Sequence, residues 1–287
     1  YWQWVATLRS AEVIRQGLSL AEERFLAVKQ AVINGDKAAI DTVESLILVQ
    51  KLRNDLSKQL MDSLNQTLSI NNLLWNVAEG TVFIPNSITS FDLADLSTYE
   101  DFAIRAHPEL RGIQNKGEQL DNDRKYYAEQ IKPELDVNYN FLLQEGNPDN
   151  QNFAINNYKA GVSFSVPLFL RKERSKLQMS KIKISENDLK MDQKSREIIN
   201  KVRMAYNQTV VTNDLVNQQR QVVNNYVRML EGEQQKFNNG ESSIFLLNSR
   251  QNKLLEAQLK LIDLEISYRI YLAKLLWQSG YFPNLVK

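Results

Sequence analysis

The sequence contains no cysteine, and only ten glycines and six prolines occur among its 287 residues. The absence of cysteine excludes disulfides, thiolate metal sites and a cysteine nucleophile. No apolar run approaches the 18 residues that a transmembrane helix needs, so we expect no such helix. The net charge is +1 without a long run of one sign, which gives no reason to expect a nucleic-acid partner.

Catalytic and metal-binding signatures are equally scarce. His107 is the only histidine, and it precedes Pro108 at a helix break, where we expect a structural or solvent-facing role. The serines and aspartates lack the context of a nucleophile elbow or of paired carboxylates, and there is no Gly-Lys-[Ser/Thr] phosphate loop. We therefore predict that the chain is not an enzyme and that it holds no metal or other cofactor.

Long helices account for most of the remaining pattern. Between Arg171 and Asn239 there is no proline and a single glycine, which predicts one continuous helix of about 100 Å. A second helix is expected at 242–278, after a turn at Gly240, so the two form an antiparallel hairpin. Two apolar stripes on the second helix predict neighbours on both sides, as in a bundle or a closed ring of helices. One stripe contains Leu247, Leu254, Leu261, Tyr268 and Leu275, and the other contains Leu255, Leu259, Ile262, Ile266, Ala273 and Trp277.

Two stretches instead alternate apolar and polar residues with a period of two, and they predict a β-hairpin at 134–168. Such runs have about the length of a tilted membrane-spanning strand, although a soluble sheet edge gives the same alternation. In the membrane interpretation the lipid-facing residues are Leu135, Val137, Tyr139, Phe141, Tyr158, Val162, Phe164 and Val166. The lumen-facing residues are then Asn138, Asn140, Ser163 and Ser165.

The chain also repeats itself, because residues 1–75 resemble residues 206–277. Tyr1 matches Tyr206, and the turn at Gly35 matches the turn at Gly240. We therefore divide the chain into three parts. These are a helical hairpin that ends a first, truncated repeat (1–75), a linker (76–97), and a second repeat (98–287) that contains a helix, the β-hairpin 134–168 and a long helical hairpin (172–278).

Taken together, these residues resemble the TolC-type outer-membrane efflux protein family over nearly the whole chain. The most specific segment is 161–174 (Gly-Val-Ser-Phe-Ser-Val-Pro-Leu-Phe-Leu-Arg-Lys-Glu-Arg), which is similar to the family's strand, Pro-Leu-Phe and basic helix start. The turn at 236–243 (Lys-Phe-Asn-Asn-Gly-Glu-Ser-Ser) is similar to the family's Phe-x-x-Gly-x-x-Ser turn. The first turn, at 35–42, departs from the family by having Ala where Ser is usual.

The resemblance implies a mainly α fold with a β-hairpin, in a homotrimer. Long coiled-coil hairpins would form an α-barrel that extends into the periplasm, and the strands would belong to a transmembrane β-barrel in the cell outer membrane. The family's protomers contribute four strands each, so the other two are expected before Tyr1. The implied function is a passive duct of a tripartite efflux or type I secretion system, in contact with outer-membrane lipid. A periplasmic adaptor and an inner-membrane transporter would be its partners.

The ends of the two helical hairpins lie furthest from the strands and are the natural docking sites for the adaptor. The candidate residues are Gly35, Asp36, Ala39, Ile40, Gly240, Glu241, Ser242 and Ser243. Glu256, Asp263 and Glu265 are candidates for a charge-selective constriction, or for ion pairs with Lys260 and Arg269 at helical spacing.

Two other function classes stay open on the sequence. A periplasmic coiled-coil adaptor or scaffold also has long helical hairpins, but flanks them with glycine-rich β domains. A pore-forming toxin also inserts a hairpin, but is a soluble monomer before it meets a membrane. Extraction from cell envelopes only with detergent would separate the duct from both.

Overall fold

The computed structural model describes residues 1–74, 93–141, 158–166 and 169–281. These residues form two compact units. Residues 1–103 and 200–287 make up the first, which we call the helical unit, and residues 104–199 make up the second, which we call the strand unit. The expected linker at 76–97 and the loop between the strands lie largely outside the described residues.

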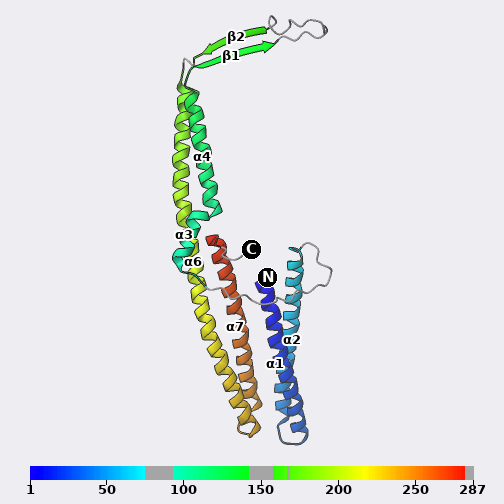
Figure 1. Ribbon diagram of the computed structural model, residues 1–287. Coiled ribbons are helices and arrows are strands. Elements are labelled where there is room, and N and C mark those ends of the chain that lie inside the picture. Colours follow the sequence, from blue (N-terminus) through cyan, green and yellow to red (C-terminus); the bar gives the residue numbers. More distant parts are fainter. Residues whose placement is uncertain (75–92, 142–157, 167–168, 282–287) are drawn as a thin grey trace, which may run out of the picture. The chain divides into compact units, whose positions relative to one another are not determined.

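The helical unit is built from two antiparallel hairpins. The first joins α1 (Trp2–Ile33) to α2 (Ala39–Asn71), and the second joins the C-terminal part of α6 (Arg171–Asn238) to α7 (Ile244–Ser279). Figure 1 shows the members of each pair side by side. The continuous helix expected from Arg171 to Asn239 is confirmed to within one residue, because nothing in this stretch interrupts the backbone ladder.

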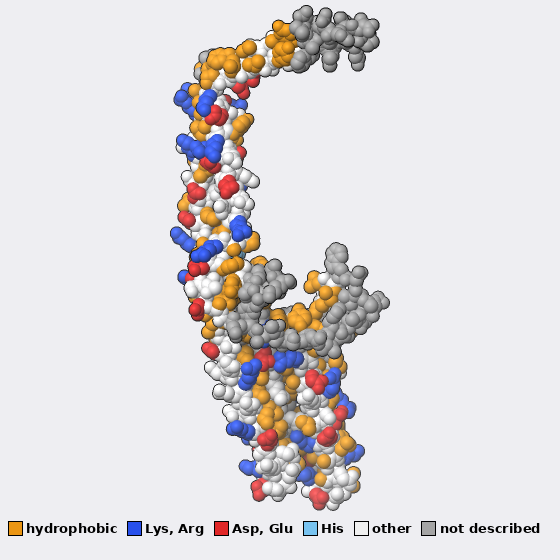
Figure 2. Space-filling view, in the orientation of Figure 1, with side chains coloured by type: hydrophobic (Ala, Val, Ile, Leu, Met, Phe, Trp, Pro, Cys, Tyr) orange, Lys and Arg blue, Asp and Glu red, His pale blue; other side chains and the backbone are white. Residues whose placement is uncertain are grey.

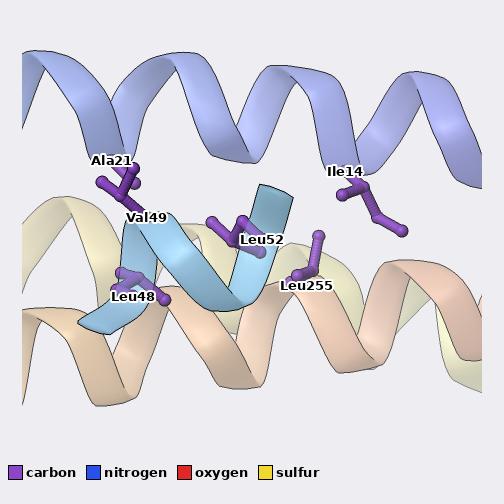
Figure 3. Close-up of a cluster of buried hydrophobic side chains, with 6 residues drawn as sticks. All are labelled: Ile14, Ala21, Leu48, Val49, Leu52 and Leu255. Carbon is purple, nitrogen blue, oxygen red and sulfur yellow. The ribbon is translucent and has the colours of Figure 1, made fainter. Parts of the chain in front are cut away.

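The two hairpins share a core, because α7 packs against α1 and also touches α2. Figure 3 shows part of this core, in which Leu255 of α7 meets side chains from both helices of the first hairpin. A second cluster lies further along the same helices. The first cluster consists of Ile14, Ala21, Leu48, Val49, Leu52 and Leu255, and the second of Trp4, Val5, Ile262 and Ile266. Leu255, Ile262 and Ile266 of the second predicted stripe of α7 therefore face the first hairpin, whereas Ala273 and Trp277 of the same stripe are exposed.

The strand unit contains α4 (Pro108–Glu129), β1 (Glu134–Phe141), β2 (Tyr158–Ser165) and the N-terminal part of α6. Asn187 of α6 donates a hydrogen bond to the carbonyl of Ile113, and Lys194 pairs with Glu109 at 2.6 Å, so these contacts hold α4 to α6. The short helix α3 (Leu96–Ala106) precedes α4.

The helix break at Pro108 is confirmed, and it explains the one histidine. α3 ends at Ala106 and α4 begins at Pro108, with His107 as the N-cap residue between them. The His107 Nδ1 accepts a hydrogen bond from the Glu109 amide at 3.3 Å, and the side chain is buried. A cap of this kind satisfies one of the amides that a helix start leaves unpaired. Of the two roles we expected for His107, structural or solvent-facing, it therefore has the structural one.

Candidate membrane hairpin and docking tips

The β-hairpin separates its side chains by chemistry. The strands pair antiparallel in a register that sets Val137 opposite Val162 and Leu135 opposite Phe164. On the other face Asn138 lies opposite Gly161 and Asp136 opposite Ser163. Because side chains alternate along each strand, this register collects the apolar residues on one face and the polar residues on the other.

The predicted lipid-facing and lumen-facing sets thus fall on opposite faces of the sheet. Asn138, Asn140, Ser163 and Ser165 occupy the polar face together with Lys159. Val166 lies one residue beyond β2, and the side chain of Phe141 is outside what the structure describes. The rings of Tyr139 and Tyr158 stack on the apolar face with their centroids 5.3 Å apart.

The apolar face is not covered by any other described part of the chain. Val137 is 71% exposed, Val162 70% and Phe164 68%. Valine and phenylalanine are among the residue types that folded proteins most often bury. Figure 2 shows these hydrophobic side chains along the strands. An isolated pair of strands is marginally stable in water, so this face requires an apolar environment and the sheet edges require partners.

The ends of the helical hairpins form two turns of the same geometry. Gly35 and Gly240 adopt φ values of 82° and 79°, in the left-handed region. In the first turn the amide of Asp36 donates to the carbonyl of Ala31 and that of Gly35 to Val32. The second turn has the same pattern, in which one amide donates to the carbonyl five residues back and the amide before it to the carbonyl three residues back. The donor and acceptor pairs there are Glu241 with Lys236, and Gly240 with Phe237. Both turns are therefore Schellman motifs, which require a residue that tolerates positive φ.

The turns differ in how the next helix begins. Ser243 caps α7 by accepting a hydrogen bond from the Leu246 amide at 3.3 Å, whereas the equivalent residue before α2 is Ala38, which cannot cap. In the second turn Ser242 Oγ also donates to Glu233, and Arg250 approaches the same carboxylate at 3.5 Å. The hydrogen bond from Ser242, followed by the contact with Arg250, holds the pKa of Glu233 below its usual value despite partial desolvation.

The two turns are joined by a side-chain contact, and a groove between α1 and the end of α6 lies beside it. Lys37, just after the first turn, places its Nζ 4.2 Å from the centroid of the Phe237 ring at the end of α6. A groove of about 500 Å³ begins at this contact. Its lining residues are Leu20, Glu23, Arg24, Ala27, Val28, Ala31, Lys37, Gln234, Phe237 and Asn238. Of the predicted docking residues, Gly35, Asp36, Ala39, Ile40, Gly240, Glu241 and Ser243 are exposed, and Ser242 is half-buried.

The contacts of three arginines in the helical unit were not indicated by the sequence. Arg24 of α1 donates to Asn248 Oδ1 and to Gln251 Oε1 of α7, and burial lowers the pKa of its guanidinium. Glu265 of α7 pairs with Arg9 of α1 at 2.8 Å and with Arg220 of α6 at 2.9 Å. Glu256 pairs with Lys253. Glu265 therefore joins α7 to α1 and α6. The spacing of residues along α7 alone could not predict these two contacts.

Neither a metal site nor a helical membrane span emerges from the described residues. Within them, no group of three or more His, Asp or Glu side chains is placed to hold a metal ion. None of the described helices is both long and apolar enough to cross a membrane.

Solved structures of outer-membrane channels share this fold. The Campylobacter jejuni CmeC outer membrane channel aligns with a TM-score of 0.76 at 13% identity, over 98% of this chain and 60% of its own. VceC, an outer membrane protein of Vibrio cholerae, aligns with a TM-score of 0.77 at 13% identity, over 98% and 67%. The open state of the Neisseria gonorrhoeae MtrE outer membrane channel gives 0.78 at 12% identity, over 98% and 64%.

The chain thus spans about 60–67% of the length of these structures. No curated protein sequence matches it. The family model described as outer membrane efflux protein, however, matches residues 105–277, which is more than half of the chain and includes both strands, α6 and most of α7. The chain belongs to the outer membrane efflux protein family.

Proposed function

We propose that this chain forms part of a passive export duct in the cell outer membrane, within a tripartite efflux or type I secretion system. The observation that carries the proposal is the β-hairpin, whose apolar face is exposed and whose opposite face is polar. A strand that contacts lipid on one side and water on the other needs this division. Family membership supports the same assignment.

A single hairpin cannot cross a bilayer alone, because its outer strands leave backbone groups unpaired. Closure into a barrel pairs all of them, and we propose that the full-length protein assembles as a homotrimer to close it, with each copy adding the two further strands that are expected before Tyr1. Leu135, Val137, Tyr139, Tyr158, Val162, Phe164 and Val166, with Phe141 at the end of β1, would then face lipid. Asn138, Asn140, Ser163 and Ser165 would line the water-filled lumen.

The helical unit would continue the duct into the periplasm, with the two turns as its docking end. The exposed residues of both turns and the groove beside Lys37 and Phe237 offer a surface for the hairpin of a periplasmic adaptor. An inner-membrane pump would supply the energy, because the sequence has no phosphate-binding loop of its own.

The test is a conductance measurement on the full-length protein, purified in detergent and added to a planar lipid bilayer. We expect long-lived ohmic steps from a trimeric species. Recovery of the protein from cells without detergent, as a water-soluble monomer, would overturn the membrane assignment. A trimer that inserts into liposomes but passes no ions would overturn the open duct. The insertion of the hairpin into the membrane would then be all that remains of the proposal.

A further inference from the structure

Positive charge is concentrated where the chain leaves the sheet and enters α6. Residues 171–176 contain four cations and one acidic residue, Glu173, in a chain whose net charge is only +1. The four cations are Arg171, Lys172, Arg174 and Lys176, which we call the basic segment. The first three are exposed and Lys176 is half-buried. Figure 2 shows Lys and Arg side chains on the helices close to the strands.

The stability of the helix does not explain the basic segment. The N-terminus of a helix carries a partial positive charge, which favours acidic side chains in the first turn and disfavours basic ones. In α6 Glu173 is the only acidic residue of that turn, and cations surround it. Natural sequences break a local rule of this kind mainly at functional sites, so the charges point to a partner.

Ion pairs do not neutralise the basic segment either. At the adjoining end of α4, Arg124 and Lys125 both pair with Asp121, at 2.8 and 2.9 Å. None of the four cations of the basic segment forms such a pair with another residue that the structure describes. The Nζ of Lys176 instead lies 5.9 Å from the centroid of the Tyr127 ring. The positive charge of the basic segment therefore stays available for an anionic ligand.

The basic segment comes directly after the exposed apolar residues of the hairpin. Val166, just beyond β2, is 48% exposed, and Phe169, two residues before Arg171, is 86% exposed. With the strands in a bilayer, the first turns of α6 would lie at its surface. At a rise of 1.5 Å per residue they extend over about 8 Å, which is close to the thickness of one headgroup layer, roughly 5–8 Å. The long side chains of Arg and Lys can reach into this layer while their aliphatic parts stay beside apolar groups.

We propose that the basic segment binds the headgroups of anionic phospholipids in the periplasmic leaflet of the outer membrane. The inference rests on the proposed insertion of the hairpin and adds the class of lipid that the protein prefers. The apolar face of the strands contacts acyl chains and cannot distinguish an anionic lipid from a neutral one. Cations beside a membrane span can, because each Lys or Arg near an anionic surface strengthens binding by about fivefold.

Vesicle flotation of the full-length protein tests this inference. The protein is purified in detergent and diluted into vesicles of phosphatidylcholine alone, or of phosphatidylcholine with phosphatidylglycerol added. We expect association with the anionic vesicles to be stronger by at least about fivefold at low salt. The preference should shrink at high salt, because ions screen the attraction between exposed charges.

The test variant replaces the whole basic segment, as Arg171→Gln, Lys172→Gln, Arg174→Gln and Lys176→Gln. It should lose the preference for anionic vesicles and keep its association with neutral ones. Thermal unfolding should show no loss of stability, because the helix dipole disfavours the charges that are removed. In a second variant, Glu173→Gln, the preference should increase, because the one acidic residue of the first turn is removed.

The matched control removes two lysines and two arginines from exposed positions further along α6. Its substitutions are Lys190→Gln, Arg196→Gln, Arg228→Gln and Lys236→Gln. These positions lie at least about 20 Å beyond Lys176 along the helix, outside the headgroup layer. The control should therefore keep the preference for anionic vesicles, although its net charge equals that of the test variant.

Two outcomes would overturn the inference. The first is equal association of the wild type with neutral and anionic vesicles, and the second is an equal loss of preference in the test variant and the control. If the wild type still conducts in neutral bilayers in either case, the proposed duct stands without the lipid preference. Failure to associate with vesicles of either kind would remove the proposed membrane insertion as well.

Discussion

The ammonium of Lys37 lies 4.2 Å from the centre of the Phe237 ring, over its face, and so joins the first helical hairpin to the second at their turns. The two residues are 200 positions apart in the sequence, and each lies within three residues of a Schellman glycine. A cation over an aromatic face is attracted by the ring quadrupole. This contact links the two proposed docking turns.

A double-mutant cycle on Lys37→Met and Phe237→Leu should give a coupling free energy of about 0.5–1 kcal/mol, as expected for an exposed cation–π pair. The measurement is denaturant unfolding of the wild type, both single variants and the double variant. Lys29→Met serves as a control, because it removes an exposed lysine elsewhere on α1. Additive effects of Lys37→Met and Phe237→Leu would show that the two side chains do not interact.

The unequal caps of α2 and α7 give a second prediction. Ser243→Ala should destabilise the start of α7 by about 1 kcal/mol, because the Leu246 amide loses its acceptor. Ala38→Ser should stabilise α2 by a similar amount, because it supplies the cap that this turn lacks. Hydrogen exchange of the first-turn amides should therefore accelerate in Ser243→Ala and slow in Ala38→Ser. The same direction of change in both variants would contradict the assignment of the caps.

Much of the fold follows from local sequence patterns. The scarcity of Gly and Pro between Arg171 and Asn239 predicted α6 almost to its end, and the alternation around Val137 and Val162 predicted which side chains share a face. Both features depend on backbone periods of 3.6 and two residues, which a sequence displays directly. The turn at Gly240 could also be predicted from the sequence, because few residues other than glycine tolerate its positive φ.

The polar contacts between helices could not be predicted in this way. Arg24 and Asn248 are 224 residues apart, and Arg9 reaches Glu265 across another helix interface. In the sequence nothing distinguishes Glu265 from the other acidic residues of α7. The only basic residue at helical spacing from it was Arg269. Which charges meet depends on how the hairpins pack, and that information lies in the shapes of the buried faces rather than in spacing along one helix.

The carboxylate of Glu265 should make stability depend on acid pH. Burial by itself would raise its pKa, but the hydrogen bonds and charges of Arg220 and Arg9 outweigh burial, so the pKa lies below the ordinary value of 4.5. A lowered pKa in the folded state means that the unfolded state binds the proton more tightly. The stabilisation is therefore complete above about pH 4.5 and is lost as the pH falls through the lower, folded value.

Glu265→Gln removes the charge and nearly preserves the shape, so it should destabilise the protein by about 2 kcal/mol at pH 7 and flatten the acid limb of the stability curve. Thermal unfolding between pH 7 and pH 3 measures both effects. Glu256→Gln is the control, because its exposed pair with Lys253 should contribute little. Parallel pH curves for the wild type and Glu265→Gln would contradict the assigned role.

Lysine substitutions on neighbouring residues of β1 test the two faces of the hairpin. Val137→Lys places a charge in the middle of the apolar face, where a lipid-facing lysine costs about 2–4 kcal/mol near the bilayer midplane. Asn138→Lys adds the same charge one residue further on, but on the polar face opposite Gly161, where water can solvate it. We therefore expect Val137→Lys to deplete the protein from outer-membrane fractions and to abolish conductance, whereas Asn138→Lys should insert normally and shift selectivity towards anions.

Val162→Lys, across the sheet from Val137, should behave like Val137→Lys. Normal insertion of both valine variants, together with failure of Asn138→Lys, would mean that the apolar face meets protein or the lumen, and that lipid contacts the other side.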